Sequence, residues 1–248
     1  MAVATKPLDR PTSRGALALA AATMLVFKMF VPFGREILYP LTLMATWVHE
    51  MGHGLSALVM GGRFDSLQIF ADASGLAWST SQSGWREAVH SAGGLMAPPI
   101  VGAVVLAVSR GPRRARIVLS VLALAMIASL PIWVRTLVGW IAIPIVALVV
   151  GAFAWVGGER ERMVMAQFIG LALASDTVTR IDYLFVSSAE IAGERRPSDI
   201  ARVADALGGP RLAWGALLAA FSLACVAIGM RAAWWRRAER IPARGAVR

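Results

Sequence analysis

The sequence is poor in charged residues and has a single cysteine. Only 16% of its 248 residues are charged, against about one quarter in a typical soluble domain, and 57% are hydrophobic. A chain with so little charge cannot cover the surface of a soluble globular enzyme of this size. The lone Cys225 excludes an intrachain disulfide framework and a thiolate metal cluster. These absences favour an integral membrane protein.

Lysine is also scarce, because only Lys6 and Lys28 among the 25 basic residues are lysines. The formal net charge of +10 would suggest a nucleic-acid partner on a soluble protein. Here the arginines gather between long apolar runs, at 110–116 and 231–240, which is typical of charge that flanks membrane spans. We therefore expect contact with the acidic headgroups of a lipid bilayer and no nucleic acid.

Seven apolar runs approach the length of about 20 residues that a transmembrane helix needs. They are continuous, unlike the short alternating segments of a membrane barrel. The sequence therefore predicts an all-α polytopic membrane protein with about 6–7 transmembrane helices, forming a single integral-membrane domain over residues 1–248. The runs are 15–34, 37–60, 88–108, 115–134, 136–156, 163–186 and 212–235.

Seven crossings would place the two basic termini on opposite sides of the membrane, against the positive-inside rule. The conflict disappears if the segment 88–108 enters and leaves on the same side. This segment contains the pairs Gly93-Gly94 and Pro98-Pro99, which are unfavourable in a continuous helix. We therefore hypothesise that 88–108 is re-entrant.

Two of the three histidines lie in the run 37–60, together with a glutamate. His49 and His53 are four residues apart, so on a helix their imidazoles point from one face, about 6 Å apart along the axis. This spacing suits two ligands of one tetrahedral Zn²⁺ ion. Glu50, beside them, is placed to act as a general base. Because polar groups are costly in an apolar span, three within five residues predict a metal site rather than structural side chains.

A catalytic zinc needs a third protein ligand, and four residues are candidates. Asp176 is the first choice because it follows an apolar run, although an ion pair with Arg180 would also account for it. Asp199 is an alternative, although its position is also explained by a helix that begins there, with Ser198 as the cap and Asp199 in the first turn. Asp182 and His90 are further alternatives. The candidate region for the third ligand is therefore 163–211, with His90 outside it.

A polar stretch at 61–87 follows the histidine-containing run. It begins with Gly61-Gly62, continues with alternating apolar residues such as Leu67 and Ile69, and contains a further glycine, Gly75. This pattern predicts a short β-hairpin or a loop at the membrane surface.

The segment His49-Glu-Met-Gly-His53-Gly, an HExxH motif in an apolar helix, resembles the site-2 proteases, which are the M50 intramembrane zinc metallopeptidases of regulated intramembrane proteolysis. Gly61-Gly62-Arg63, the stretch 92–98 and Ser198-Asp199-Ile-Ala201 are similar to the M50B-like branch. The resemblance implies a zinc-dependent endopeptidase that hydrolyses membrane-embedded protein substrates with a zinc-bound water. It implies His49 and His53 as ligands, Glu50 as general base, and a β-hairpin after the HExxH helix.

The sequence departs from this family in one respect. It contains neither the Asn-Pro-Asp-Gly nor the Leu-Asp-Gly motif that supplies the third ligand in well-characterised members, and Thr136 stands where related chains have asparagine. The alternative function is therefore a catalytically degenerate, metal-binding membrane protein that binds client helices without cleavage. A transporter is disfavoured because the sequence shows no inverted repeat. The richness in arginine and alanine favours a GC-rich bacterial genome and the bacterial inner membrane.

Overall fold

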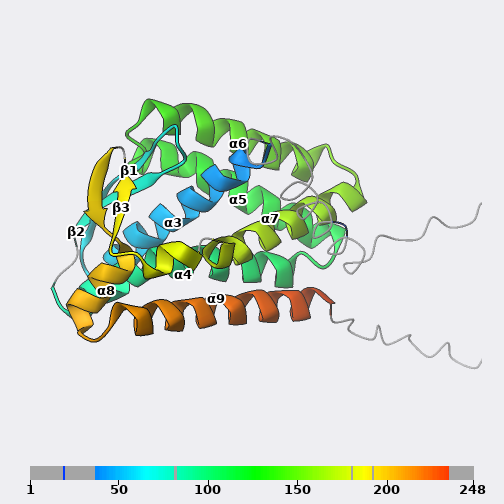
Figure 1. Cartoon of the computed structure of the whole chain (residues 1–248). Helices are drawn as coiled ribbons and strands as arrows, with labels where there is room; N and C mark the ends of the chain where they lie inside the picture. Colours follow the sequence, from blue (N-terminus) through cyan, green and yellow to red (C-terminus); the bar gives the residue numbers. More distant parts are fainter. Residues whose placement is uncertain (1–18, 20–36, 81–82, 180, 192, 235–248) are drawn as a thin grey trace, which may run out of the picture.

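The chain folds mainly into helices, with two small antiparallel hairpins (Figure 1). This computed structural model describes residue 19 and residues 37–80, 83–179, 181–191 and 193–234. In chain order the elements are α3 (Tyr39–Val59), β1 (Arg63–Ile69), β2 (Gly75–Thr80), α4 (Trp85–Val108), α5 (Pro112–Trp133), α6 (Leu137–Trp155), α7 (Glu159–Thr179), the 3-10 helix η1 (Ile181–Phe185), β3 (Ser188–Ile191), β4 (Glu194–Pro197), α8 (Asp199–Leu207) and α9 (Arg211–Trp234).

Four helices in the described part of the chain, α4, α5, α6 and α9, are long and apolar enough to cross a membrane. They correspond to four of the seven predicted runs. The run 15–34 lies outside the described residues, apart from residue 19. The helices α3 and α7 have 21 residues each, but polar side chains such as Glu50 and Asp176 lower their hydropathy. The predicted total of 6–7 transmembrane helices is therefore not confirmed.

Helix α4 is continuous over 24 residues, with no break at Gly93-Gly94 or Pro98-Pro99, which argues against the hypothesis that 88–108 is re-entrant. At this length the helix extends about 36 Å, enough to cross a bilayer. Pro98 and Pro99 are buried inside it. Its glycines allow close contact with neighbouring helices, since a Cβ at Gly102 would overlap the backbone of Ala174 in α7. The Leu95 carbonyl, which Pro99 cannot bond, accepts a hydrogen bond from the Thr177 hydroxyl of α7 at 3.1 Å.

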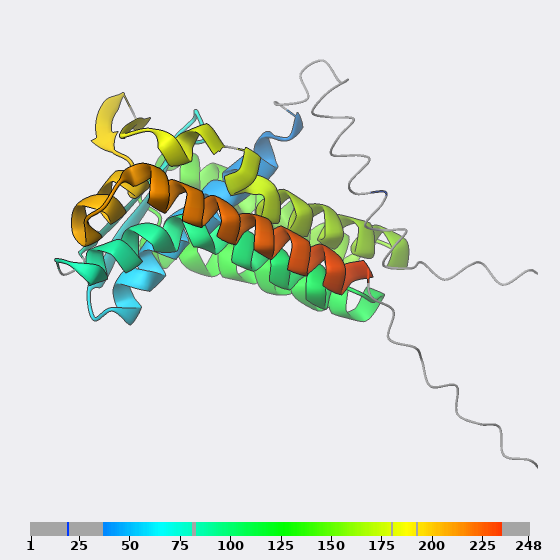
Figure 2. The ribbon, with the colours of Figure 1, turned by 60° about the horizontal axis from the view of Figure 1, so that its bottom comes forward.

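The same helix lies at the centre of the bundle, because it packs against α3, α7, α8 and α9. The helices α5 and α6 form a second packed pair. Both hairpins and α8 lie at one end of the bundle, on the left in the two views of Figures 1 and 2. This arrangement brings the second half of α3 close to the start of α8, although the two are about 150 residues apart in the sequence.

The predicted hairpin within 61–87 is present, since β1 and β2 pair antiparallel. In β1 the side chains of Phe64, Leu67 and Ile69 are buried, while intervening residues are exposed or half-buried. The strand therefore packs one apolar face on the helices. The turn is stabilised by Asp72, whose Oδ1 accepts hydrogen bonds from the backbone N–H and the hydroxyl of Ser74 at 2.9 and 2.7 Å.

Strand β1 is held on both sides. On one side it pairs with β2; on the other, the Leu67 carbonyl accepts a hydrogen bond from the Arg135 N–H at 3.0 Å. The Thr136 hydroxyl also accepts from the Ile69 N–H at 3.1 Å and donates to the Ile69 carbonyl at 2.9 Å. Thr136 thus fastens the hairpin to the α5–α6 junction. Within the described residues β2 pairs with β1 alone and forms the edge.

The direction of the main-chain groups in β2 follows from these contacts. In an antiparallel pair, residues directly opposite each other turn their N–H and C=O groups either both toward the partner or both away from it. Leu67 and Ile69 turn theirs away from β2, and their opposite residues are Ala77 and Gly75. Ala77 and Gly75 therefore present their main-chain groups on the outer edge of β2.

Candidate metal centre

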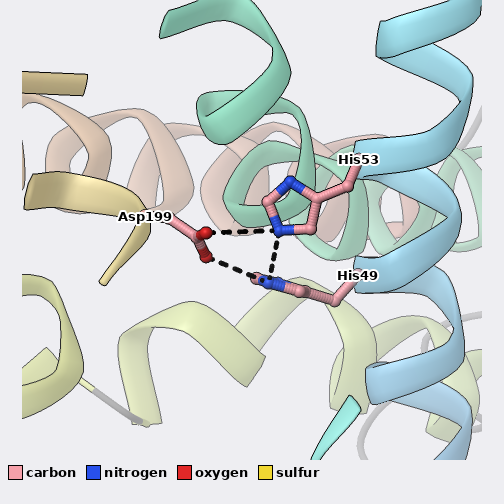
Figure 3. A group of neighbouring side chains, drawn as sticks. All are labelled: His49, His53 and Asp199. Carbon is pink, nitrogen blue, oxygen red and sulfur yellow. Dashed lines mark hydrogen bonds and ion pairs between the residues drawn. The ribbon is translucent and has the colours of Figure 1, made fainter. Parts of the chain in front are cut away.

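Helix α3 positions both histidines of the HExxH segment. His49 and His53 are one helical turn apart, and their ring centroids lie 4.7 Å apart in an edge-to-face arrangement. Their Nε2 atoms are separated by 3.1 Å. Figure 3 shows the two rings directed away from α3 toward the same point. Helix periodicity thus places the two imidazole nitrogens together, as the spacing in the sequence predicts.

Asp199, the first residue of α8, lies opposite the two histidines (Figure 3). Its Oδ2 is 3.2 Å from His49 Nε2, and its Oδ1 is 3.4 Å from His53 Nε2. Ligands bound at about 2.0–2.1 Å to one tetrahedral zinc ion lie about 3.3 Å apart. The three side chains supply two imidazole nitrogens and a carboxylate at this separation, so the donor set fits a zinc ion.

The other candidates for the third ligand are placed differently. Asp176 lines the same pocket as the histidines but is not one of the three clustered donors. His90 lies beside His53, and its ring nitrogens lie close to the His53 carbonyl oxygen and the Ser79 hydroxyl. The side chain of Asp182 lies outside the described residues. The sequence predicts Asp199 only as an alternative to Asp176, and the signal in favour of Asp199 is the resemblance of Ser198-Asp199-Ile-Ala201 to a segment of the M50B-like branch.

Ser198 holds Asp199 in place. Its N–H donates to the Ser187 carbonyl at 3.0 Å, and its hydroxyl donates to the Val186 carbonyl at 2.7 Å. The same hydroxyl oxygen accepts from the Ala201 N–H at 3.2 Å, so it also caps α8. Because Ser198 is fully buried, these bonds fix the start of α8 to the base of the β3–β4 hairpin. The orientation of the Asp199 carboxylate follows from this anchorage.

The electrostatic environment keeps Asp199 ionised. Burial alone would raise the pKa of its carboxyl group, but the charges and hydrogen bonds of His53 and His49 outweigh burial and hold this pKa well below its ordinary value. The Tyr183 hydroxyl donates to Asp199 Oδ2 at 3.4 Å. Burial and the nearby Asp199 carboxylate raise the pKa of Tyr183, so the phenol remains a protonated donor. An ionised carboxylate is the form that binds a metal.

Glu50 is buried beside the cluster without belonging to it. Strand β2 runs close to it: a Cβ at Gly75 would lie 2.7 Å from both Glu50 Cγ and Glu50 Oε1. The backbone of Ala77 also lies next to the Glu50 carboxylate. This agrees with the outward direction of the Ala77 N–H in β2. The hairpin thus packs against the carboxylate that the sequence predicts to be a general base.

A pocket of about 300 Å³ contains the whole arrangement. The β3–β4 hairpin forms part of its wall, and residues of α3, the β1–β2 turn, β2, α4, α7, η1 and α8 form the remainder. The charged side chains that line it, besides Asp199 and Glu50, are Asp176, Glu190, Arg196 and Arg202. The clustered donors therefore face a cavity that has both polar and apolar lining residues.

Comparison with curated proteins and with solved structures finds no match. A family model, described as Peptidase M50B-like, does match, and it covers residues 16–229. The matched region contains the HExxH helix, both hairpins and Asp199, which is most of the chain and every residue of the candidate metal centre. The chain therefore belongs to the Peptidase M50B-like family.

Proposed function

We propose that the protein is a zinc-dependent intramembrane endopeptidase that hydrolyses peptide bonds of membrane-embedded protein substrates. The observation that carries this proposal is the convergence of His49, His53 and Asp199, whose donor atoms lie within 4.8 Å of one another beside the buried Glu50. Membership in a peptidase family and four helices able to cross a membrane support it. From its composition we place the protein in a bacterial inner membrane.

In this proposal His49, His53 and Asp199 hold the zinc ion. When bound, zinc lowers the pKa of water and polarises a carbonyl group. Glu50 takes a proton from the attacking water and delivers it to the leaving amine of the cleaved bond. Strand β2, whose Ala77 backbone lies next to the Glu50 carboxylate, packs against this base. Tyr183 and Ser198 keep the Asp199 carboxylate directed at the histidines.

The substrate must be extended near the scissile bond, because the amides of a helix are hydrogen-bonded and covered. We propose that the extended segment adds to the outer edge of β2, where Gly75 and the carbonyl of Ala77 offer main-chain groups. Glycine at position 75 keeps this edge close to Glu50, since a side chain there would overlap the carboxylate. Strand addition would therefore place the segment beside the base.

The assignment of the third ligand predicts a difference between two aspartates in the same pocket. Loss of a residue that only supports a metal ligand lowers metal affinity about 10–100-fold. Asp199→Ala removes a proposed ligand itself, so it is expected to lower zinc affinity by more than this and to abolish cleavage. Asp176→Ala is expected to keep zinc. The measurement is the zinc content of the purified full-length proteins after competition with a chelator. Zinc loss from Asp176→Ala with retention by Asp199→Ala would assign the ligand to Asp176.

The role of the hairpin predicts that disrupting the β1–β2 pairing impairs cleavage without removing zinc. Gln68 pairs with Leu76 in β2, and proline at this position would remove an N–H that joins the strands. Gln68→Pro is expected to reduce cleavage about 10–100-fold through misplacement of the substrate, with unchanged zinc content. Gln68→Ala, which keeps the N–H, is the control. Normal cleavage by Gln68→Pro would refute substrate binding at β2.

A further inference from the structure

The third histidine, His90, is buried in α4 next to the metal centre. Its Nδ1 lies 3.0 Å from the carbonyl oxygen of His53, and the Nδ1 of His53 lies 2.9 Å from the carbonyl oxygen of His90. The centroids of the two rings are 5.1 Å apart. Each imidazole thus contacts the main chain of the other residue, and the pair joins α3 to α4.

These contacts determine which nitrogen of each ring carries the proton. A carbonyl oxygen only accepts hydrogen bonds, so the Nδ1 of His53 and the Nδ1 of His90 are both donors. In the neutral ring, the Nε2 of His53 then keeps its lone pair, which points at His49 and Asp199. A histidine with its Nδ1–H bonded in this way is prepared to bind a metal through Nε2.

The remaining nitrogen of His90 is also occupied. With Nδ1 as the donor, its Nε2 is an acceptor, and the hydroxyl of Ser79 in β2 lies 3.2 Å away. Both ring nitrogens of His90 are therefore engaged, one by α3 and one by β2. His90 therefore has no free ring nitrogen that could bind the metal, and it is not one of the proposed ligands. The ring instead links the hairpin, α4 and the backbone of a ligand.

We infer that His90 is a positioning residue for the metal centre: its imidazole, held by Ser79, fixes the backbone of His53 against α4. In that position the His53 Nδ1–H reaches the His90 carbonyl and the His53 Nε2 faces Asp199. This inference rests on the proposed zinc site and adds a residue to it that is not a ligand. Outer-shell partners of this kind contribute about 10–100-fold to metal affinity.

The test measures metal binding by the full-length protein in detergent. The zinc dissociation constant is obtained by chelator competition, and the d–d absorption spectrum is recorded with Co²⁺ in place of zinc. His90→Ala is expected to raise the dissociation constant about 10–100-fold and to change the cobalt spectrum. His90→Asn, whose amide N–H can donate at the position of Nδ1, is expected to restore most of both. Ser79→Ala is expected to change the dissociation constant and the cobalt spectrum in the same direction as His90→Ala, but to a smaller extent.

Ser109→Ala is the matched control, because Ser109 is also buried and polar but lies at the far end of α4. It should lower thermal stability without changing the dissociation constant. Wild-type affinity and an unchanged cobalt spectrum in His90→Ala would overturn the inference, and so would equal losses in His90→Ala and His90→Asn. If His90→Ala does not fold, wild-type values for Ser79→Ala would overturn it. Failure of the wild-type protein to bind either metal would refute the proposed function itself.

Discussion

The Glu50→Gln protein is expected to retain zinc and to cleave substrate about 10²–10⁴-fold more slowly than the wild type. Glutamine has nearly the shape of glutamate but cannot take up the proton of the attacking water. Glu50 is not one of the three clustered donors, so metal binding should be preserved. A large loss of rate with full zinc occupancy would distinguish an endopeptidase from a metal-binding protein that only holds client helices.

The measurement compares membranes that contain the wild-type or the Glu50→Gln protein, by mass spectrometry of newly formed N-termini in membrane proteins. Zinc content is determined on the same purified proteins. Glu190→Gln is the control, because Glu190 is another acid of the pocket but lies in β3, away from the HExxH segment. Equal cleavage by the Glu50→Gln protein and the wild type would exclude Glu50 as the base.

The second large effect is expected from one added methyl group. A Cβ at Gly94 of α4 would overlap the His53 ring, with Nε2 and the two adjoining carbons as its nearest atoms. The two helices are also in close contact one turn away, since a Cβ at Gly52 would lie 2.5 Å from the Gly93 carbonyl oxygen and from Ala97 Cβ, so the interface has no spare room for a methyl group. Gly94→Ala is therefore expected to displace the imidazole and to abolish zinc binding and cleavage. Overpacking of this kind costs about 1–3 kcal/mol of stability.

A second glycine provides the comparison. A Cβ at Gly151 of α6 would meet only Ala123 Cβ, at an ordinary distance of 3.8 Å. Gly151→Ala should therefore bind zinc like the wild type, as measured by chelator competition. Equal zinc affinity of the Gly94→Ala and Gly151→Ala proteins would mean that His53 does not lie against α4 in the way described.

The histidine pair could be predicted from the sequence because its geometry is local. Residues four apart on a helix share a face whatever surrounds the helix, so His49 and His53 needed no further information. The third donor could not be predicted in this way. Asp199 has the sequence features of a helix start, and the capping of α8 by Ser198 shows that this interpretation holds as well. Its approach to the histidines depends on packing between distant segments.

The hairpin was also predictable, whereas the conformation of α4 was not. Alternating apolar residues between glycines favour a hairpin through local preferences, and β1 and β2 form one. The prolines and glycines of α4 suggested a broken segment by the same reasoning. There, close contacts with α3 and α7 outweigh local preference, because the glycines that weaken the helix also allow its neighbours to approach.

The β3–β4 hairpin forms a wall of the pocket and ends two residues before Asp199, to which Ser198 joins it. Any peptide that fills the pocket and steadies this wall therefore also steadies a ligand of the proposed ion. Such a peptide would raise the affinity of the protein for the ion. By thermodynamic linkage, the ion would then raise the affinity for the peptide by the same factor. If the protein acts as proposed, substrate binding and metal retention are therefore coupled through Ser198, the one residue between β4 and Asp199.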